Sequence, residues 1–344
     1  MNQLNFFYRQ TNPLFFSIEK VFNNIARTIR EDYGSEFSVE EILLPLTTSP
    51  RNILKNIKFS RRHQSDLNHI TGDIHYALLG WNKKKIKILT VHDCVSMHQY
   101  SKIDLRYWIM KWVWFSWPLH KADMVTVISE NTKNELLSFT RVDPGKIRVI
   151  PNFVDPELRP SEKEFNSTMP RILFIGTTPN KNLERLVKAL SGIPAILDIV
   201  GKLDENQVAV LTQEKIRYEQ SYRLPVEEIR KKYEQCDLLA FPSTYEGFGL
   251  PIVEAQVVGR PVLTSQLPPM NEVAGKGACL VDPYDTDSIR AGLLRIIGEP
   301  GYRKTLVEEG KMNVTRFSLA KVSGEYVSLY RELLLKKSIL QTRK

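Results

Sequence analysis

Short apolar runs alternate with segments of helical spacing along the whole chain. Mainly apolar runs of four to six residues, such as Ile86–Val91 and Leu238–Phe241, are bounded by glycine, proline or polar residues, as buried strands are. The longer segments repeat their apolar positions every three or four residues, which is typical of amphipathic helices. The other predicted strands are Leu4–Arg9, Asp66–His69, Met124–Ile128, Ile147–Ile150, Arg171–Ile175, Ile196–Val200 and Pro261–Thr264, and the predicted helices are Phe15–Arg30, Asn131–Phe139, Asn182–Leu190, Ile289–Ile297 and Phe317–Leu334.

This alternation predicts two parallel α/β sheets, because strands joined through helices pair in parallel. At 344 residues the chain is longer than one ordinary hydrophobic core requires. The segment 155–170, DPELRPSEKEFNSTMP, is proline-rich, charged and without a period, so we interpret it as a linker. We expect an N-terminal domain over residues 1–160, a second domain over residues 161–316 and a C-terminal helix within residues 317–344.

The composition is typical of a protein that neither spans a membrane nor depends on disulfides. Hydrophobic residues make up 42% of the chain and charged residues 25%. The three cysteines (Cys94, Cys236 and Cys279) match no zinc or disulfide pattern, no apolar run approaches about 20 residues, and the N-terminus has no signal-peptide layout. We therefore expect a cytoplasmic protein. The net charge of +9 suits anionic substrates, an anionic lipid surface or solubility alone, and no module or arginine-rich tract for nucleic acid is present.

The clearest site chemistry lies in Asp237–Arg260, DLLAFPSTYEGFGLPIVEAQVVGR. An apolar run stops at Pro242, a small polar loop contains Gly247 and Gly249, and Pro251 opens a segment of helical spacing. A strand, a glycine loop and a helix start, in that order, direct unpaired amides and the positive end of a helix dipole at one place. This arrangement favours phosphate.

Two carboxylates flank this predicted anion site. Glu246 lies in the loop, and Glu254 follows eight residues later, inside the helix. Glu254 is placed to accept hydrogen bonds from a ribose, and Glu246 from a sugar held beside the glycines. An ordinary loop glutamate and an ordinary acidic residue near a helix start are the alternative. A glycosidase pair is disfavoured, because a nucleoside diphosphate leaves without a proton when its charge is stabilised.

Polar residues also follow two strands of the first half. His92 and Asp93 come directly after Ile86–Val91, and four polar or small residues lie at the end of the preceding strand (His69, Thr71, Gly72 and Asp73). The carboxyl ends of parallel strands are where open α/β sheets bind ligands. The alternative for any one of the histidines is a structural role.

The second half offers a cation. Gly176 and Thr177 follow the strand Arg171–Ile175, and Lys181 stands where the next helix begins. An ammonium at that place can reach a diphosphate bound at the neighbouring loop, although a surface lysine is the alternative. Lys202, after a further strand, is a weaker second candidate.

Two further patterns have structural explanations. The segment Tyr107–Pro118, YWIMKWVWFSWP, holds four of the five tryptophans. Because Trp108, Trp112 and Phe115 share one helical stripe, we expect them to fill core volume, with a lipid interface as the alternative. The Asp-Thr-Asp triplet within Asp282–Asp287 precedes a helix, so we expect it to cap that helix rather than bind a metal.

The stretch FPSTYEGFGLPIVEA resembles the signature of the retaining GT-B glycosyltransferases of family four (glycosyl transferases group 1), whose two glutamates are separated by seven residues. The flanking segments match in order as well: VHDCVSM, VTVISENTKNEL, KIRVIPNFVDPEL, ILFIGTTPNKNLERLVKAL, YRLPVEEIRKKYEQCDLLAFPS and GRPVLTSQLPPMNEVAGKGACLVDPYD. The resemblance covers Asp66 to Phe317 and is strongest after Arg171. It implies the α/β GT-B fold, with two Rossmann-like parallel-sheet domains facing each other across a cleft and a C-terminal helix packing back on the N-terminal domain.

The resemblance also implies an activity. It implies a retaining, metal-independent transfer of a hexose from GDP-mannose or a UDP-hexose to a glycan or glycolipid acceptor, in surface polysaccharide or lipopolysaccharide biosynthesis. No cofactor and no nucleic-acid partner are expected, and peripheral association with the cytoplasmic membrane face is left open. The implied catalytic residues are Glu246, His92 and Lys181, and the implied donor-binding residues are Gly247, Phe248, Gly249, Leu250, Glu254, Gly176 and Thr177.

The chain departs from the family pattern in two places. The family's glycine-rich loop after the first strand is replaced by TNPLFFS, which contains no glycine, and Arg9 or Ser17 is the candidate substitute. Thr177 stands where the family often has an arginine, which leaves Lys181 as the cation of that loop. Two alternatives therefore stay open: a differently acting enzyme on the same fold, such as a sugar-nucleotide epimerase or a sugar phosphorylase, and a non-catalytic partner subunit.

Overall fold

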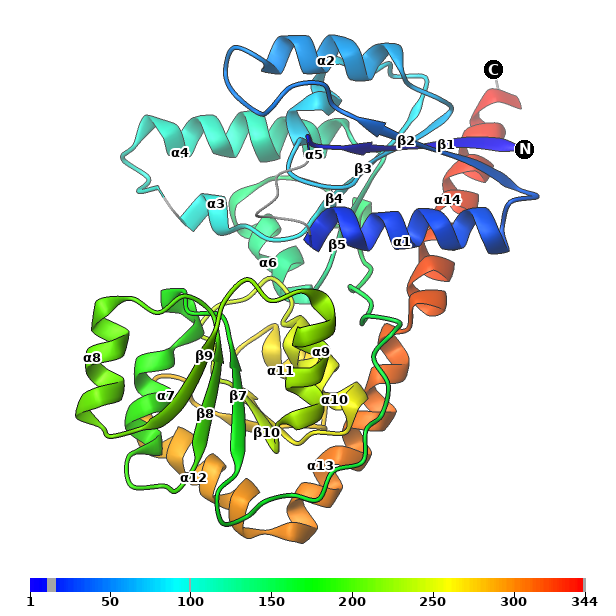
Figure 1. Ribbon diagram of the computed structural model, residues 1–344. Coiled ribbons are helices and arrows are strands. Elements are labelled where there is room, and N and C mark those ends of the chain that lie inside the picture. Colours follow the sequence, from blue (N-terminus) through cyan, green and yellow to red (C-terminus); the bar gives the residue numbers. More distant parts are fainter. Residues whose placement is uncertain (11–16, 99, 343–344) are drawn as a thin grey trace. The chain divides into compact units, whose positions relative to one another are not determined.

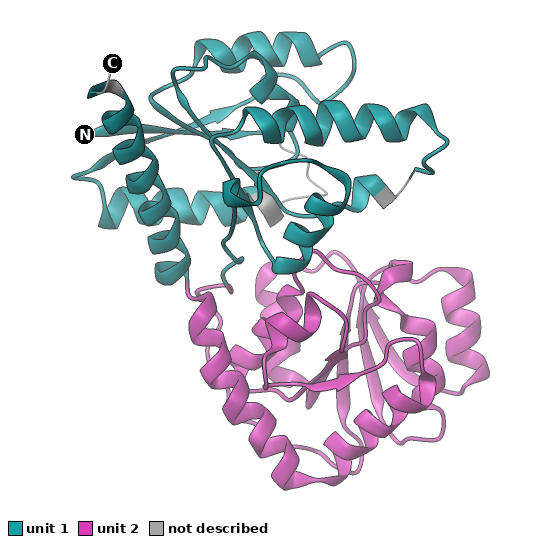
Figure 2. Ribbon diagram, turned by 180° about the vertical axis from the view of Figure 1, so that it is seen from behind, with its two compact units in different colours: residues 1–153, 319–344 teal, residues 154–318 magenta. Residues whose placement is uncertain are grey.

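The computed structural model describes residues 1–10, 17–98 and 100–342 (Figure 1). The chain forms two compact units (Figure 2). The first consists of residues 1–153 and 319–344, and the second of residues 154–318. Each unit is built around its own six-stranded sheet, in which every strand pair described is parallel.

The strands of the first unit follow the order β2-β1-β3-β4-β5-β6. The central strand β4 is buried along its whole length, whereas the edge strand β2 exposes most of its residues. The elements of this unit are β1 (Asn2–Tyr8), α1 (Ser17–Asp32), β2 (Phe37–Leu43), α2 (Ile53–Arg62), β3 (Leu67–Ile70), η1 (His75–Gly80), β4 (Ile86–Val91), α3 (Val95–His98), α4 (Leu105–Ile109), η2 (Met110–Ser116), α5 (Trp117–Lys121), β5 (Met124–Val127), α6 (Glu130–Phe139), η3 (Pro144–Lys146), β6 (Ile147–Val149) and α14 (Leu319–Thr342).

Two apolar cores stabilise the first unit. The segments α2, η1 and α4 to α5 pack into one core, and α1 and α14 pack into the other. α14 joins this unit although the whole second unit separates it from β6 in sequence. The Tyr330 hydroxyl of α14 lies 2.8 Å from Nδ1 of His69, whose Nε2 lies 2.7 Å from Oγ1 of Thr90. Burial lowers the pKa of His69 to about 3, so this imidazole is neutral.

The second unit has the strand order β12-β11-β10-β7-β8-β9. Its two central strands, β10 and β7, pair directly. Its elements are β7 (Arg171–Ile175), η4 (Pro179–Lys181), α7 (Leu183–Leu190), β8 (Ile196–Val200), α8 (Glu205–Gln213), β9 (Arg217–Ser221), α9 (Val226–Gln235), β10 (Leu238–Phe241), α10 (Leu250–Val258), β11 (Val262–Ser265), α11 (Met270–Ala274), β12 (Cys279–Val281), α12 (Thr286–Gly298), α13 (Pro300–Asn313) and η5 (Val314–Phe317).

Four of the inner strands are confirmed to the residue. β4, β7, β8 and β10 have the bounds that the apolar runs predict. Three strands that the runs do not predict, β2, β9 and β12, stand at sheet edges, and β2 and β9 expose most of their residues. These edge strands need no continuous apolar run, because only burial of both faces of a strand demands apolar side chains at successive positions.

The expectation that the tryptophans of residues 107–118 fill core volume is wrong for three of the four. Trp108, Trp112 and Trp117 are 43%, 44% and 51% exposed, whereas Phe115 is buried. The reason is local: η2 is a π-helix, whose wider turn holds more residues than an α-helical turn, so the spacing that aligned Trp112 with Phe115 does not apply. Within the described residues, no helix is both long enough and apolar enough to cross a bilayer.

Candidate functional site

β10 leads from the buried sheet through a loop into α10. All four residues of β10 are buried, and the strand ends before Pro242. Gly249 caps α10 with a φ of +100°, which residues with a Cβ rarely adopt, and Pro251 occupies the first helical turn, as the sequence predicts. The loop 242–249 and the N-terminus of α10 therefore lie at the carboxyl edge of the sheet, where α/β folds bind ligands.

The loop after β7 brings a lysine to this place. Lys181, at the end of η4, lies with its Nζ 2.6 Å from Oε1 of Glu246 and 4.7 Å from the ring centroid of Phe241. The Lys181 and Glu246 side chains are 18% and 13% exposed, so the ion pair is largely shielded from water. The fold thus joins two of the residues that the sequence singles out, 65 positions apart in the chain.

Gly176 leaves room for that lysine. Its φ is +90°, and a Cβ at this position would lie 2.8 Å from Cε of Lys181. Any larger residue would both strain the backbone and displace the lysine side chain. Gly176 therefore positions Lys181.

Two asparagines that the sequence did not single out connect the two loops. The Asn180 side chain donates to the carbonyl oxygen of Tyr245 at 2.9 Å, and the Asn180 carbonyl accepts from the amide of Thr244 at 2.8 Å. Asn182 has a φ of +68°, and its buried amide donates to the carbonyl oxygens of Pro242 and Pro283. An asparagine directly before a helix was the available signal, because asparagine tolerates left-handed backbone.

Glu254 is oriented by a buried phenol. The Tyr233 hydroxyl of α9 donates to Oε2 of Glu254 at 2.6 Å. Burial, and after it the charge of Glu254, raises the pKa of Tyr233 well above its ordinary value. The phenol therefore stays protonated and holds the carboxylate in one orientation.

The other predicted donor-binding residues have contacts of their own. The Thr177 hydroxyl donates to the carbonyl oxygen of Lys202 at 2.7 Å. Phe248 is buried with its ring edge-on to that of Phe317, at 5.6 Å between centroids. The remaining two, Gly247 in the loop and Leu250 at the first position of α10, are partly buried.

His92 directly follows β4 at the carboxyl edge of the first unit's sheet. Its Nε2 lies 2.8 Å from the carbonyl oxygen of Thr71. A carbonyl only accepts, so Nε2 carries the proton and Nδ1 is left as an acceptor. Burial lowers the pKa of His92, which keeps the ring neutral. Two neighbouring candidates have structural partners: His69 within the core, and Asp73, which accepts from Nε1 of Trp114 at 2.6 Å.

Two other sequence candidates are now placed. Arg9 forms an ion pair with Glu19 at 2.7 Å, whereas residues 11–16 of the segment that replaces the glycine loop, and the side chain of Ser17, lie outside the described residues. Asp285 accepts from the amide of Asp287 and caps α12, which confirms the capping interpretation of the triplet.

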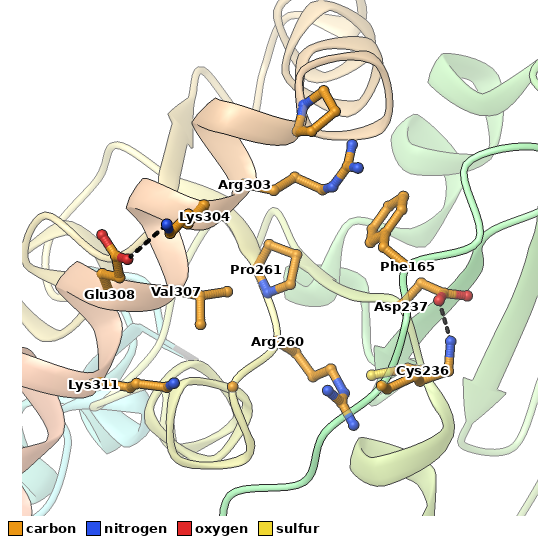
Figure 3. Close-up of a pocket in the computed structure, with 13 residues that line it drawn as sticks. Phe165, Cys236, Asp237, Arg260, Pro261, Arg303, Lys304, Val307, Glu308 and Lys311 are labelled. Carbon is orange, nitrogen blue, oxygen red and sulfur yellow. Dashed lines mark hydrogen bonds and ion pairs between the residues drawn. The ribbon is translucent and has the colours of Figure 1, made fainter.

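A cavity of about 370 Å³ lies at the opposite, amino edge of the second sheet (Figure 3). Its lining is rich in cations, but structural contacts engage most of them. Arg260 donates to three main-chain carbonyl oxygens, and Lys163 pairs with Asp237. Arg303 donates to two carbonyls at the end of α12 and stacks on Phe165. These cations hold the amino edge of the unit together, so the carboxyl edge is the stronger candidate.

Two family models match the chain, one after the other. The model described as Glycosyltransferase Family 4 matches residues 30–158. The model described as Glycosyl transferases group 1 matches residues 156–312, which include the loop and helix of the candidate site.

Curated relatives and solved structures point the same way. MMP alpha-(1->4)-mannosyltransferase of Mycolicibacterium hassiacum is 30% identical over 228 residues, which are 62% of this chain and 54% of that protein. O-antigen chain mannosyltransferase B of Escherichia coli is 32% identical over 110 residues, which are 32% of this chain and 29% of that protein. The matches therefore span about half or less of these two relatives. The structure of Anabaena HepE in complex with UDP and glucose is similar over 96% of this chain and 100% of that one, with a TM-score of 0.74 and 17% identity. At that identity the likeness shows the fold, which is GT-B.

Proposed function

This chain belongs to the glycosyl transferases group 1 family, and from that premise we propose that it transfers a hexose from a nucleoside diphosphate sugar to an acceptor hydroxyl. The observation that carries the proposal is the pairing of Lys181 with Glu246 beside the N-terminus of α10. A diphosphate bound there meets an ammonium group and the positive end of a helix dipole.

The proposed chemistry needs charge stabilisation more than a proton donor. As the bond between the anomeric carbon and the diphosphate breaks, negative charge grows on the departing phosphate oxygen. In this proposal, Lys181 and the amides of the 247–249 loop stabilise that charge. We therefore propose that no divalent metal is required.

The two glutamates then have orienting roles. Glu246 positions hydroxyls of the transferred sugar, and Glu254, fixed by Tyr233, accepts from the ribose hydroxyls. In the first unit, Nδ1 of His92 accepts from a sugar hydroxyl, of the donor or of the acceptor. A carboxylate that holds an ammonium at 2.6 Å is better suited to orient a sugar than to attack it, which favours this assignment for Glu246.

We further propose that the anomeric configuration is retained by front-face attack. The acceptor oxygen bonds to the anomeric carbon on the face from which the diphosphate leaves. The bond from that carbon to the diphosphate breaks, and the acceptor proton passes to the departing phosphate oxygen. The family resemblance supports this mechanism.

The names of the relatives suggest the donor and the acceptor. Two of them are named as mannosyltransferases, one of which acts on an O-antigen chain, and the HepE structure holds UDP and glucose. We therefore propose GDP-mannose or a UDP-hexose as the donor, and a surface polysaccharide or lipopolysaccharide as the product.

The test begins with a thermal-shift panel of nucleotide sugars, followed by an assay for released nucleoside diphosphate. We expect one nucleotide class to raise Tm and the wild type to release its diphosphate. Glu246→Ala should lose most of this release while its affinity for the nucleotide stays largely intact. A panel without any shift, together with no release by the wild type, would refute the proposal.

The same assay separates the two alternatives. A sugar-nucleotide epimerase would convert the donor without any acceptor and release no diphosphate. A non-catalytic partner subunit would bind a nucleotide sugar and leave it intact. Proton NMR of the glycosidic product reads the anomeric configuration directly.

A further inference from the structure

The cavity at the amino edge of the second sheet has an excess of positive charge (Figure 3). Among the described residues, its lining includes five cations (Lys163, Arg260, Arg303, Lys304 and Lys311) and two carboxylates (Asp237 and Glu308). The buried carboxylate of Asp237 pairs with Lys163. Glu308 lies 3.9 Å from Lys304, but both side chains are exposed, so water screens their attraction. The two arginines and Lys311 therefore give the cavity its net positive charge.

The contacts of the two arginines satisfy hydrogen bonds without neutralising the charge. Arg260 is 4% exposed and donates to three main-chain carbonyl oxygens, and Arg303 donates to two at the end of α12. A carbonyl is a neutral acceptor, and a helix C-terminus carries only about half a unit of negative charge. Burial accordingly lowers the pKa of both Arg260 and Arg303. An anion in the cavity would stabilise both guanidinium charges.

Arg303 also has donors to offer such an anion. Its Nη1 donates to the carbonyl oxygens of Ile296 and Ile297, and its guanidinium carbon lies 4.1 Å from the ring centroid of Phe165. No described residue accepts a hydrogen bond from its Nε or Nη2. These two atoms form the edge with which a guanidinium binds two oxygens of one phosphate or carboxylate. The contacts of Nη1 and of the ring thus fix the orientation of an edge that is still available.

Helix α13 extends the cationic lining away from this edge. Arg303, Val307 and Lys311 are spaced four residues apart, so they share one face of the helix. At about 1.5 Å of rise per residue, the two cations are about 12 Å apart along the axis. Val307 lies between them, and Pro261 adds a second apolar group to the lining. The volume of about 370 Å³ lies within the range of about 300–1,000 Å³ that is typical of small-molecule sites.

We propose that this cavity binds a small phosphorylated metabolite with two anionic groups. The Nε and Nη2 edge of Arg303 binds one phosphate, and the Lys311 ammonium pairs with the second anionic group. The carbon chain between them packs on Val307 and Pro261. An adjoining hollow carries Glu162 and Glu164, which repel anions, so the ligand lies against α13. Because the cavity and the loop 242–249 lie at opposite edges of the sheet, this ligand does not compete with the donor.

The wild type can be titrated with two sugar phosphates that differ in one phosphate group. Calorimetry and thermal shift are run with fructose 1,6-bisphosphate and with fructose 6-phosphate, at an ionic strength matched with sodium chloride. We expect the bisphosphate to bind at one site per chain, to raise Tm, and to bind about tenfold or more tightly than the monophosphate. Absence of binding, or equal affinity for the two compounds, would overturn the proposal.

Variants assign the binding to this cavity. Lys311→Gln should weaken bisphosphate binding about tenfold, and Arg303→Lys, which keeps the charge and removes the paired donors, should weaken it by a similar factor. Lys276→Gln is the matched control, because Lys276 is an exposed lysine of the same unit outside the cavity, and it should bind like the wild type. Lys181→Met should also bind like the wild type. Loss of binding in Lys181→Met would place the ligand at the candidate site instead, and equal losses in Lys311→Gln and Lys276→Gln would show attraction to net charge alone; either result would overturn the proposal.

Discussion

Replacing Lys181 by methionine keeps the length of the side chain and removes its charge. In the folded protein the Lys181 ammonium lies 2.6 Å from Oε1 of Glu246, and the methylene groups of the side chain pass beside Gly176. Methionine fills the same path over the Phe241 ring, so the loops should keep their arrangement. The substitution therefore isolates the electrostatic contribution.

The size of the effect can be worked from this geometry. A phosphate oxygen about 3 Å from Nζ, at an effective dielectric constant of about 20, attracts the ammonium by about 5.5 kcal/mol before solvation is counted. Glu246 offsets part of that attraction. Loss of one group that stabilises developing charge typically costs about 2.7–4 kcal/mol, or about 10²–10³ in kcat. We expect a fall in kcat within that range, with a smaller rise in KM for the donor.

The assay is steady-state release of nucleoside diphosphate, with the folded fraction of each variant measured by urea unfolding. Lys202→Met is the matched control, because Lys202 is an exposed lysine of the neighbouring loop. It should stay within about threefold of the wild type. The reasoning fails if Lys181→Met retains full kcat, or if both lysine variants lose activity equally.

Three further predictions follow from other contacts. Gly176→Ala should lower kcat by displacing Lys181. The double variant Gly176→Ala, Lys181→Met should have nearly the same kcat as Lys181→Met alone. If the two losses in kcat multiply, Gly176 does not act by positioning Lys181. Glu254→Ala should weaken the binding of a nucleoside diphosphate, and Tyr233→Phe should weaken it to a smaller degree. Calorimetry with a nucleotide that lacks the ribose hydroxyls should show no loss of affinity for either variant. An equal loss with that nucleotide would contradict the ribose role of Glu254. The pKa of His69 is about 3 in the folded state and near 6.5 in the unfolded state, so the unfolded state binds the proton first as the pH falls. The contribution of His69 to the free energy of unfolding is therefore full above pH 6.5 and falls by about 1.4 kcal/mol per pH unit towards pH 3. Urea unfolding of His69→Asn across that range should show a slope smaller by one proton, and an unchanged slope would disprove the assignment.

The inner strands could be predicted because burial on both faces demands an unbroken apolar run. β7 and β10 are bounded by residues that a buried strand excludes, and their ends are therefore visible in the sequence. β2 and β9 are mostly exposed, so they do not require an apolar run. β9 reads RYEQS and is exposed almost throughout, so nothing in its composition separates it from a loop.

The residue types of the candidate site could be predicted from the sequence, but the contacts that position them could not. A cation, a glycine loop and two carboxylates are recognisable from residue type and spacing alone. The contacts that place them depend on tertiary structure. Tyr233 reaches Glu254 from another helix, and Asn180 and Asn182 join loops that lie about 60 residues apart. These partners are distant in sequence, so a local pattern of residues cannot predict them.

The tryptophans of residues 107–118 show a different limit. The periodicity argument assumed one regular helix, but η2 changes the number of residues per turn in the middle of the segment. The composition of the segment indicated either a core or an interface, and only the backbone geometry decided which side chains faced outward.

The place of α14 in the first unit has a consequence for biosynthesis. A ribosome makes all of the second unit before it makes the helix that supplies Val322, Tyr326 and Tyr330 to the first unit's interior. The half that is translated first is thus the half completed last. Until α14 arrives, one flank of the β1–β6 sheet remains uncovered, a state in which nascent chains depend on chaperones. A premature stop before position 319 should therefore harm the amino-terminal half, far from the lesion in the gene.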